Sequence, residues 1–86
     1  MKLKKGFVLR EVAGETVVVP AGAELNFHGM LTLNETAKTL WQALETETNQ
    51  DALVEVILGE FNIDEATAKR DVALFIEKLK GLDFLG

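Results

Sequence analysis

The sequence predicts an α+β fold of winged-helix-like order, in which a three-stranded antiparallel sheet is followed by three helices. Before residue 34 the chain is rich in β-branched and aromatic residues separated by glycines, which is typical of strands and turns. After residue 34, apolar residues recur at helical spacing, and a capping residue precedes each such stretch. We therefore expect one domain over residues 1–86, with a β-meander at residues 1–33 and a three-helix bundle and tail at residues 34–86.

Three strands are expected at residues 7–12, 16–19 and 25–33. Residues 13–15 form the tight turn between the first two, and Pro20 ends the second because proline cannot donate to a strand ladder. Apolar and polar side chains alternate along the third strand, which predicts that it is buried on one face only. The two sets are Leu25, Phe27, Leu31 and Leu33 against Asn26, His28, Met30 and Thr32.

The first two helices begin at polar residues suited to N-caps. Asn34 precedes a helix over about residues 35–44, and Trp41 lies on its apolar stripe as a core anchor. Residues 48–51 (Thr-Asn-Gln-Asp) resemble a capping box with Thr48 as the cap, and predict a second helix to about residue 61.

The third helix is expected to begin at Asp64, which caps it. Lys78 and Lys80 lie in its last turn, where positive charge suits the helix dipole, and Gly81 is expected at the left-handed C-cap position. The last residues, 82–85, are then expected to dock as an extended tail.

Composition and charge argue against several classes of function. The net charge is −5, with nine Lys and Arg against fourteen Asp and Glu, whereas nucleic-acid binding depends on cations that neutralise phosphates. No apolar run approaches the roughly 18 residues of a membrane span, and there is no cysteine for a disulfide or a thiolate metal site. We therefore expect a soluble cytoplasmic protein that binds neither nucleic acid nor membrane.

Catalytic groups are also missing from the pattern. His28 is the single histidine and has no metal-ligating or nucleophilic partners nearby in sequence. The carboxylates lie mainly on polar helix faces, and Glu35, Asp64 and Glu65 are explained by capping. No phosphate-binding glycine pattern occurs. The sequence therefore predicts a binding module with no cofactor and no metal, not an enzyme.

Three segments together resemble the PqqD-like peptide chaperones, also called recognition elements of ribosomally made, post-translationally modified peptides (RiPPs). They are the residues 17–20 (Val-Val-Val-Pro), the residues 33–41 (Leu-Asn-Glu-Thr-Ala-Lys-Thr-Leu-Trp), and the residues 71–82, which contain Asp71, Phe75 and Gly81. The resemblance implies a three-stranded sheet packed on three helices. It also implies that the domain binds the leader segment of a precursor peptide and presents it to a modifying enzyme, often a radical S-adenosylmethionine protein.

The resemblance further implies where the leader lies. In the family it adds as a strand beside the third strand, in the cleft formed with the third helix, and strand addition suits an edge with unpaired main-chain groups. Met30 and Leu74 would help to form an apolar pocket, and Lys69 and Arg70 would attract acidic leader residues. The implied peptide-binding residues are Leu25, Phe27, His28, Met30, Leu31, Lys69, Arg70, Ala73, Leu74 and Glu77.

Two alternatives stay open at this stage. The second and third helices could form a helix-turn-helix of a winged-helix DNA-binding or transcription-regulatory domain, although acids offset the cations of the third helix. The family takes its name from pyrroloquinoline quinone (PQQ) synthesis, but leader recognition is implied more firmly than that product. Exposed strand edges would also permit a homodimer.

Overall fold

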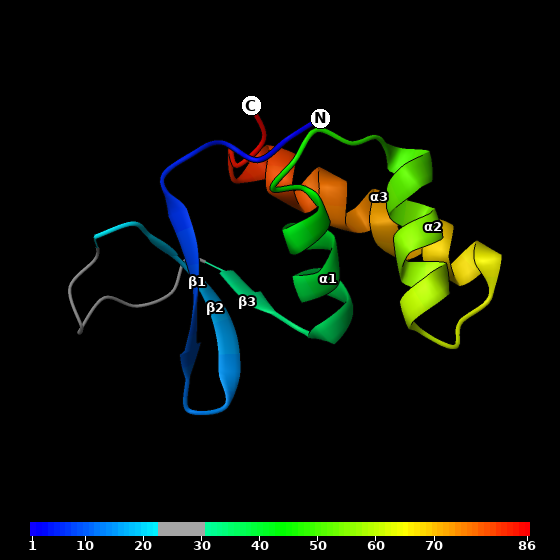
Figure 1. The fold of residues 1–86 in the computed structure, drawn as a ribbon, viewed down its shortest axis with the longest axis horizontal. Helices are drawn as coiled ribbons and strands as arrows, with labels where there is room; N and C mark the ends of the chain where they lie inside the picture. The colour runs from blue at the N-terminus through cyan, green and yellow to red at the C-terminus, as the bar shows by residue number, and fades with distance from the viewer. Residues whose placement is uncertain (23–30) are drawn as a thin grey trace.

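The computed structural model describes residues 1–22 and 31–86 (Figure 1). Its sheet and helices follow one another in the order expected from the sequence, which confirms the predicted fold class. The elements are β1 (Phe7–Val12), β2 (Glu15–Pro20), β3 (Leu31–Leu33), α1 (Glu35–Ala43), α2 (Gln50–Glu60) and α3 (Glu65–Gly81).

The sheet is antiparallel in the order β1-β2-β3, so β2 is its central strand. Ala13 and Gly14 both have positive φ, which is the backbone that a two-residue hairpin loop requires. β1 has the bounds predicted from the sequence, and β2 is one residue longer at each end because Glu15 and Pro20 pair with the two ends of β1.

β3 comprises the last three residues of the strand predicted at residues 25–33. Leu31 and Leu33 are buried and Thr32 is exposed, which confirms the alternation for these positions. The rest of that predicted strand, residues 25–30, lies outside the described residues.

Asparagine side chains cap the first two helices. The Asn34 side chain accepts a hydrogen bond of 2.8 Å from the Ala37 N–H, as predicted. The predicted cap of α2 at Thr48 is wrong, because the Asn49 side chain accepts the bond from the Ala52 N–H, at 2.9 Å. The N–H of Thr48 instead donates to the Met1 carbonyl at 2.9 Å, a long-range contact that the local sequence does not reveal.

α3 begins as predicted and ends differently. The Asp64 carboxylate accepts a 2.7 Å hydrogen bond from the Thr67 N–H and caps the helix. Gly81 was expected in the left-handed position, but it lies within the helix, and Asp83 adopts that backbone with φ of 62°. The Phe84 N–H then donates to the Leu79 carbonyl at 2.9 Å, which is the bond that defines a Schellman turn.

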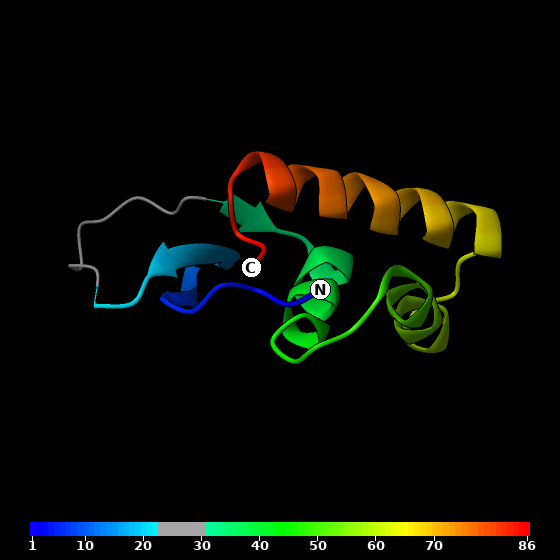
Figure 2. The same ribbon diagram turned by 90° about the horizontal axis from the view of Figure 1, so that it is seen from above.

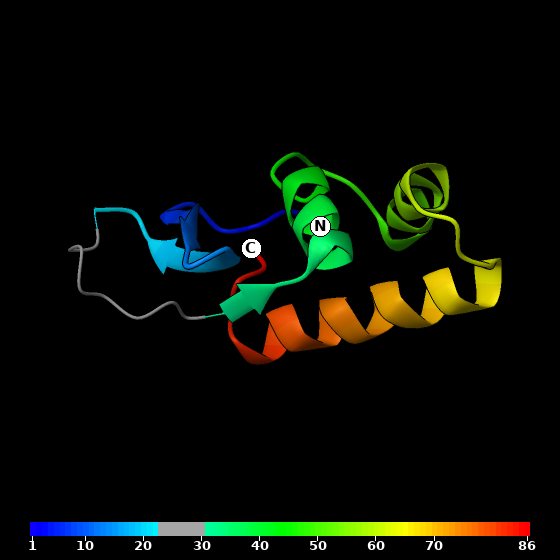
Figure 3. The same cartoon turned by 90° about the horizontal axis from the view of Figure 1, so that it is seen from below.

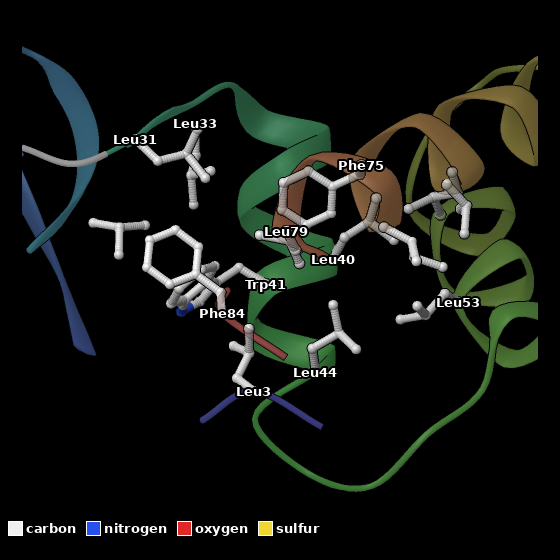
Figure 4. Close-up of a cluster of buried hydrophobic side chains, with 14 of the residues drawn as sticks. Leu3, Leu31, Leu33, Leu40, Trp41, Leu44, Leu53, Phe75, Leu79 and Phe84 are labelled. Atoms are coloured by element: carbon white, nitrogen blue, oxygen red, sulfur yellow. The ribbon is translucent and has the colours of Figure 1, made fainter. Parts of the chain in front are cut away.

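The C-terminal tail explains this choice, because it carries Phe84 into the core. The Phe84 ring is fully buried and meets the rings of Phe7 and Trp41 edge to face, at centroid distances of 4.6 and 5.5 Å. Figure 4 shows it beside Trp41, above Leu3 and Leu44. Trp41 is therefore the core anchor predicted from its stripe, with 3% of its surface exposed.

The two ends of the chain lie side by side (Figure 1). The Lys4 N–H donates to the Phe84 carbonyl at 2.8 Å, and the Gly86 N–H donates to the Lys2 carbonyl at 2.9 Å. The tail thus docks as expected, but only its last residues are extended, because residues 82–83 form the helix-ending turn. None of the described helices is both long and apolar enough to span a bilayer.

Candidate functional site

A groove of about 270 Å³ lies between β3, the start of α1 and α3. Figures 2 and 3 show β3 beside the C-terminal half of α3, with α1 following directly after the strand. We call this site the β3–α3 groove. Its lining residues are Leu31, Thr32 and Leu33 of β3, Asn34, Thr36, Ala37 and Leu40 at and in α1, and Asp71, Leu74, Phe75 and Lys78 of α3.

The α3 wall of the groove is a single stripe of side chains. Asp71, Leu74, Phe75 and Lys78 follow the spacing that places residues on one helix face. Phe75 is buried in the core and forms the base of the wall, whereas Leu74 keeps 62% of its surface exposed. Leu74 is the most exposed large apolar residue of the described chain, and it faces a groove.

The opposite wall is an edge of the sheet. β3 pairs with β2 along one side, and within residues 1–22 and 31–86 no strand pairs with its other side. The C-terminal tail does not occupy this edge, because Leu85 pairs with Leu3 instead. A strand edge of this kind presents unpaired N–H and C=O groups to an incoming chain.

Charged side chains of α3 pair mostly with their own neighbours. Lys69 contacts Glu65 at 3.0 Å, and Arg70 contacts Asp71 at 3.6 Å. Both pairs are largely exposed, so each contributes little to stability. Lys78 is also exposed, and it makes no ion pair with any described residue.

The structure brings together only part of the predicted peptide-binding set. Leu31 and Leu74 line the groove. The other α3 positions do not line it, and their role stays a prediction: Lys69, Arg70, Ala73 and Glu77. The predicted residues Leu25, Phe27, His28 and Met30 lie outside the described residues.

Three groove residues on α3 were not in the predicted peptide-binding set, namely Asp71, Phe75 and Lys78. A signal for them was present, because they continue the helical spacing from the exposed Leu74. Only the packing of β3 beside α3 shows that this face of the helix meets the strand.

The described part of the chain offers little for catalysis. It has no buried polar or charged side chain, and no cluster of three His, Cys, Asp or Glu residues that would hold a metal. A second hollow of about 590 Å³ lies between the N-terminal segment, β1 and α1, and its lining includes Lys2, Lys5 and Trp41. The β3–α3 groove differs from it in having a strand edge as one wall.

Comparison with known protein families gives a decisive match. The model of the family "Coenzyme PQQ synthesis protein D (PqqD)" matches residues 15–85, which is most of the chain. The chain belongs to the PqqD family. Curated proteins give no significant match.

A solved structure supports the PqqD fold independently. It is described as TbiB1 in complex with the TbiA(beta) leader peptide, and it is 23% identical with a TM-score of 0.73. The alignment covers 99% of this chain and 94% of that chain. This match confirms the fold that the resemblance implied, and it does not favour the alternative of a winged-helix DNA-binding domain.

Proposed function

We propose that this chain binds the leader segment of a ribosomally made precursor peptide and presents it to a modifying enzyme. Membership of the PqqD family supports this function. The TbiB1 structure, which has the same fold, is described as a complex with a leader peptide. The groove supplies both elements that strand addition needs, a strand edge with which no residue of 1–22 or 31–86 pairs, and an apolar contact beside it.

The observation that carries the proposal is the position of Leu74. Its side chain is mostly exposed although it lines the groove beside the edge of β3. A peptide strand that pairs with β3 would cover Leu74 and remove its exposed apolar surface from water. Main-chain hydrogen bonds would then hold the peptide, and the groove side chains would select it.

Membership of the PqqD family also suggests the partner enzyme, the product and the place of handover. The partner is a modifying enzyme, often a radical S-adenosylmethionine protein, and the product is either PQQ or another modified peptide. Handover of a newly made peptide would take place in the cytoplasm. Because β1 is also an edge strand of the sheet, pairing of two copies into a homodimer is a further option.

An NMR titration with a candidate leader peptide tests the proposal. Amide shifts should concentrate in β3 and along the groove face of α3. Leu74→Glu should weaken binding by about 10-fold or more, because burying a leucine contributes about 1.5–3 kcal/mol and 1.4 kcal/mol is one decade. The unfolding midpoint should change little, since Leu74 is exposed.

Val56→Glu is the matched control for this substitution. Val56 is an exposed apolar residue on α2 and does not line the groove. This variant should bind the peptide as the unaltered protein does. Shifts confined to α1 and α2, or equal losses in both variants, would contradict leader binding at β3.

A further inference from the structure

We propose that the β3–α3 groove selects peptides by the order of their charges, with a basic residue first, an apolar residue next and an acidic residue last on one face of the peptide strand. This inference rests on the proposed function, since it specifies the peptide that the same groove takes.

The α3 wall of the groove carries opposite charges at its two ends. Asp71 and Lys78 lie at opposite ends of the stripe, with Leu74 between them. Seven helical residues correspond to a rise of about 10 Å. The groove therefore has an acidic end and a basic end, separated by an apolar centre.

The direction of the guest strand follows from the directions of β3 and α3. Figures 2 and 3 show that β3 and α3 run in opposite directions along the groove. Antiparallel pairing is slightly more stable than parallel pairing, and the existing partner of β3 is antiparallel. An antiparallel guest therefore runs in the same direction as α3, so that its N-terminal part meets Asp71 and its C-terminal part meets Lys78.

The spacing of residues along the guest strand matches the length of the α3 wall. Alternate residues of a strand face the same side, and four residues span about 13 Å. This length is close to the rise between Asp71 and Lys78, and flexible charged side chains cover the difference. A basic residue would meet Asp71, the residue two positions later would cover Leu74, and an acidic residue two positions further would meet Lys78.

Both protein charges are accessible to such a peptide. Arg70 approaches Asp71 at 3.6 Å, but the two side chains are 67% and 38% exposed. An exposed pair of this kind is weak, so a cation of the peptide can compete for the carboxylate. At the start of α1, Glu35 offsets the positive end of the helix dipole that would otherwise repel a basic residue near Asp71.

Two synthetic decapeptides of equal composition test the inference, STKVLTEVST and its charge-swapped form STEVLTKVST. Both are acetylated and amidated so that terminal charges do not contribute. NMR titration at low salt should give an affinity about tenfold higher for the first, since each of two exposed charge pairs changes from attraction to repulsion. The double variant D71K/K78E should invert that preference.

The matched control is E55K/K80E, which inverts one exposed charge on α2 and one at the end of α3, both outside the groove. It should keep the preference of the unaltered protein. If both peptides shift the amides of β3 and α3 with equal affinity, the charge order is wrong while leader binding stands. A preference for the charge-swapped peptide would also overturn the order, because it would indicate a parallel guest. If neither peptide shifts those amides, both the charge order and binding at this groove fail.

Discussion

Two apolar side chains associated with α3 have opposite surroundings. Phe84, just after the helix, is completely enclosed, and Leu74, within the helix, keeps 62% of its surface exposed. Phe7 and Trp41 of the same chain enclose the Phe84 ring. The chain thus supplies the partner of Phe84 itself, whereas we propose that a bound peptide supplies the partner of Leu74.

The backbone shows the same contrast. At the end of α3, the tail and the N-terminal segment exchange main-chain hydrogen bonds, and the Leu3 N–H donates to the Leu44 carbonyl at 2.9 Å. We call this region, formed by Leu3, Phe7, Trp41 and Phe84, the closed end. At the groove, β3 is an edge strand of the sheet. Stability should therefore depend on the closed end, and binding should depend on the groove.

Phe84→Ala should give the largest effect on stability. Removing a fully buried aromatic ring costs about 3–5 kcal/mol, because its contacts are lost and a cavity remains. Leu74→Ala, the comparison variant on the groove, should change the free energy of unfolding by less than about 0.5 kcal/mol. Urea unfolding followed by circular dichroism measures both. Similar losses in the two variants would remove the distinction between the closed end and the groove.

Asp83→Val should destabilise the closed end by a smaller amount. Asp83 has a φ of 62°, and a β-branched residue in this left-handed backbone costs about 1–2 kcal/mol. Asp83→Gly is the matched control, because it also removes the exposed ion pair with Lys4 but accepts positive φ. If thermal unfolding shows the same loss for both variants, the ion pair and not the backbone would be responsible.

Much of the fold could be predicted because the signals are local. Asn34 and Asp64 accept hydrogen bonds from backbone groups three residues later, so a short sequence window contains both partners. The alternation of Leu31, Thr32 and Leu33 is equally local, and its burial pattern follows the prediction.

The predictions that failed depended on distant parts of the chain. Thr48 was predicted as a cap, but its N–H bonds to Met1, which is far away in sequence. Gly81 was predicted at the left-handed position, but burial of Phe84 against Phe7 and Trp41 places the turn two residues later, at Asp83. The preference for glycine at this position is a local signal, and the burial of an aromatic ring outweighs it.

The position of the groove could be predicted from the sequence, but most of the residues that line it could not. The resemblance placed it between the third strand and the third helix, where the structure has one. Asp71 and Lys78 were not assigned to it, because helical spacing shows which residues share a face and not which face meets β3. That information comes only from the packing of β3 beside α3.

The smallest expected effect on stability comes from the N-cap at the start of α3, far from the closed end. Hydrogen bonds from the side chain and N–H of Thr67 lower the pKa of the Asp64 carboxyl below its ordinary value of 3.8. Its contribution to stability is therefore present above that ordinary value and is lost as the pH falls through the lower, folded-state pKa. The charge of the cap should thus matter at neutral pH and disappear in acid.

Asp64→Asn separates this titration from the cap itself, because asparagine caps helices well and carries no charge. We expect the urea midpoint of the unaltered protein to fall more than that of Asp64→Asn when the pH is lowered from 5 to about 2.5. The two proteins differ only at residue 64, so the difference between their pH curves reports the charge of Asp64. Parallel pH curves would show that the charge of Asp64 contributes nothing. Peptide affinity at pH 7 should be the same in both proteins, since Asp64 does not line the groove.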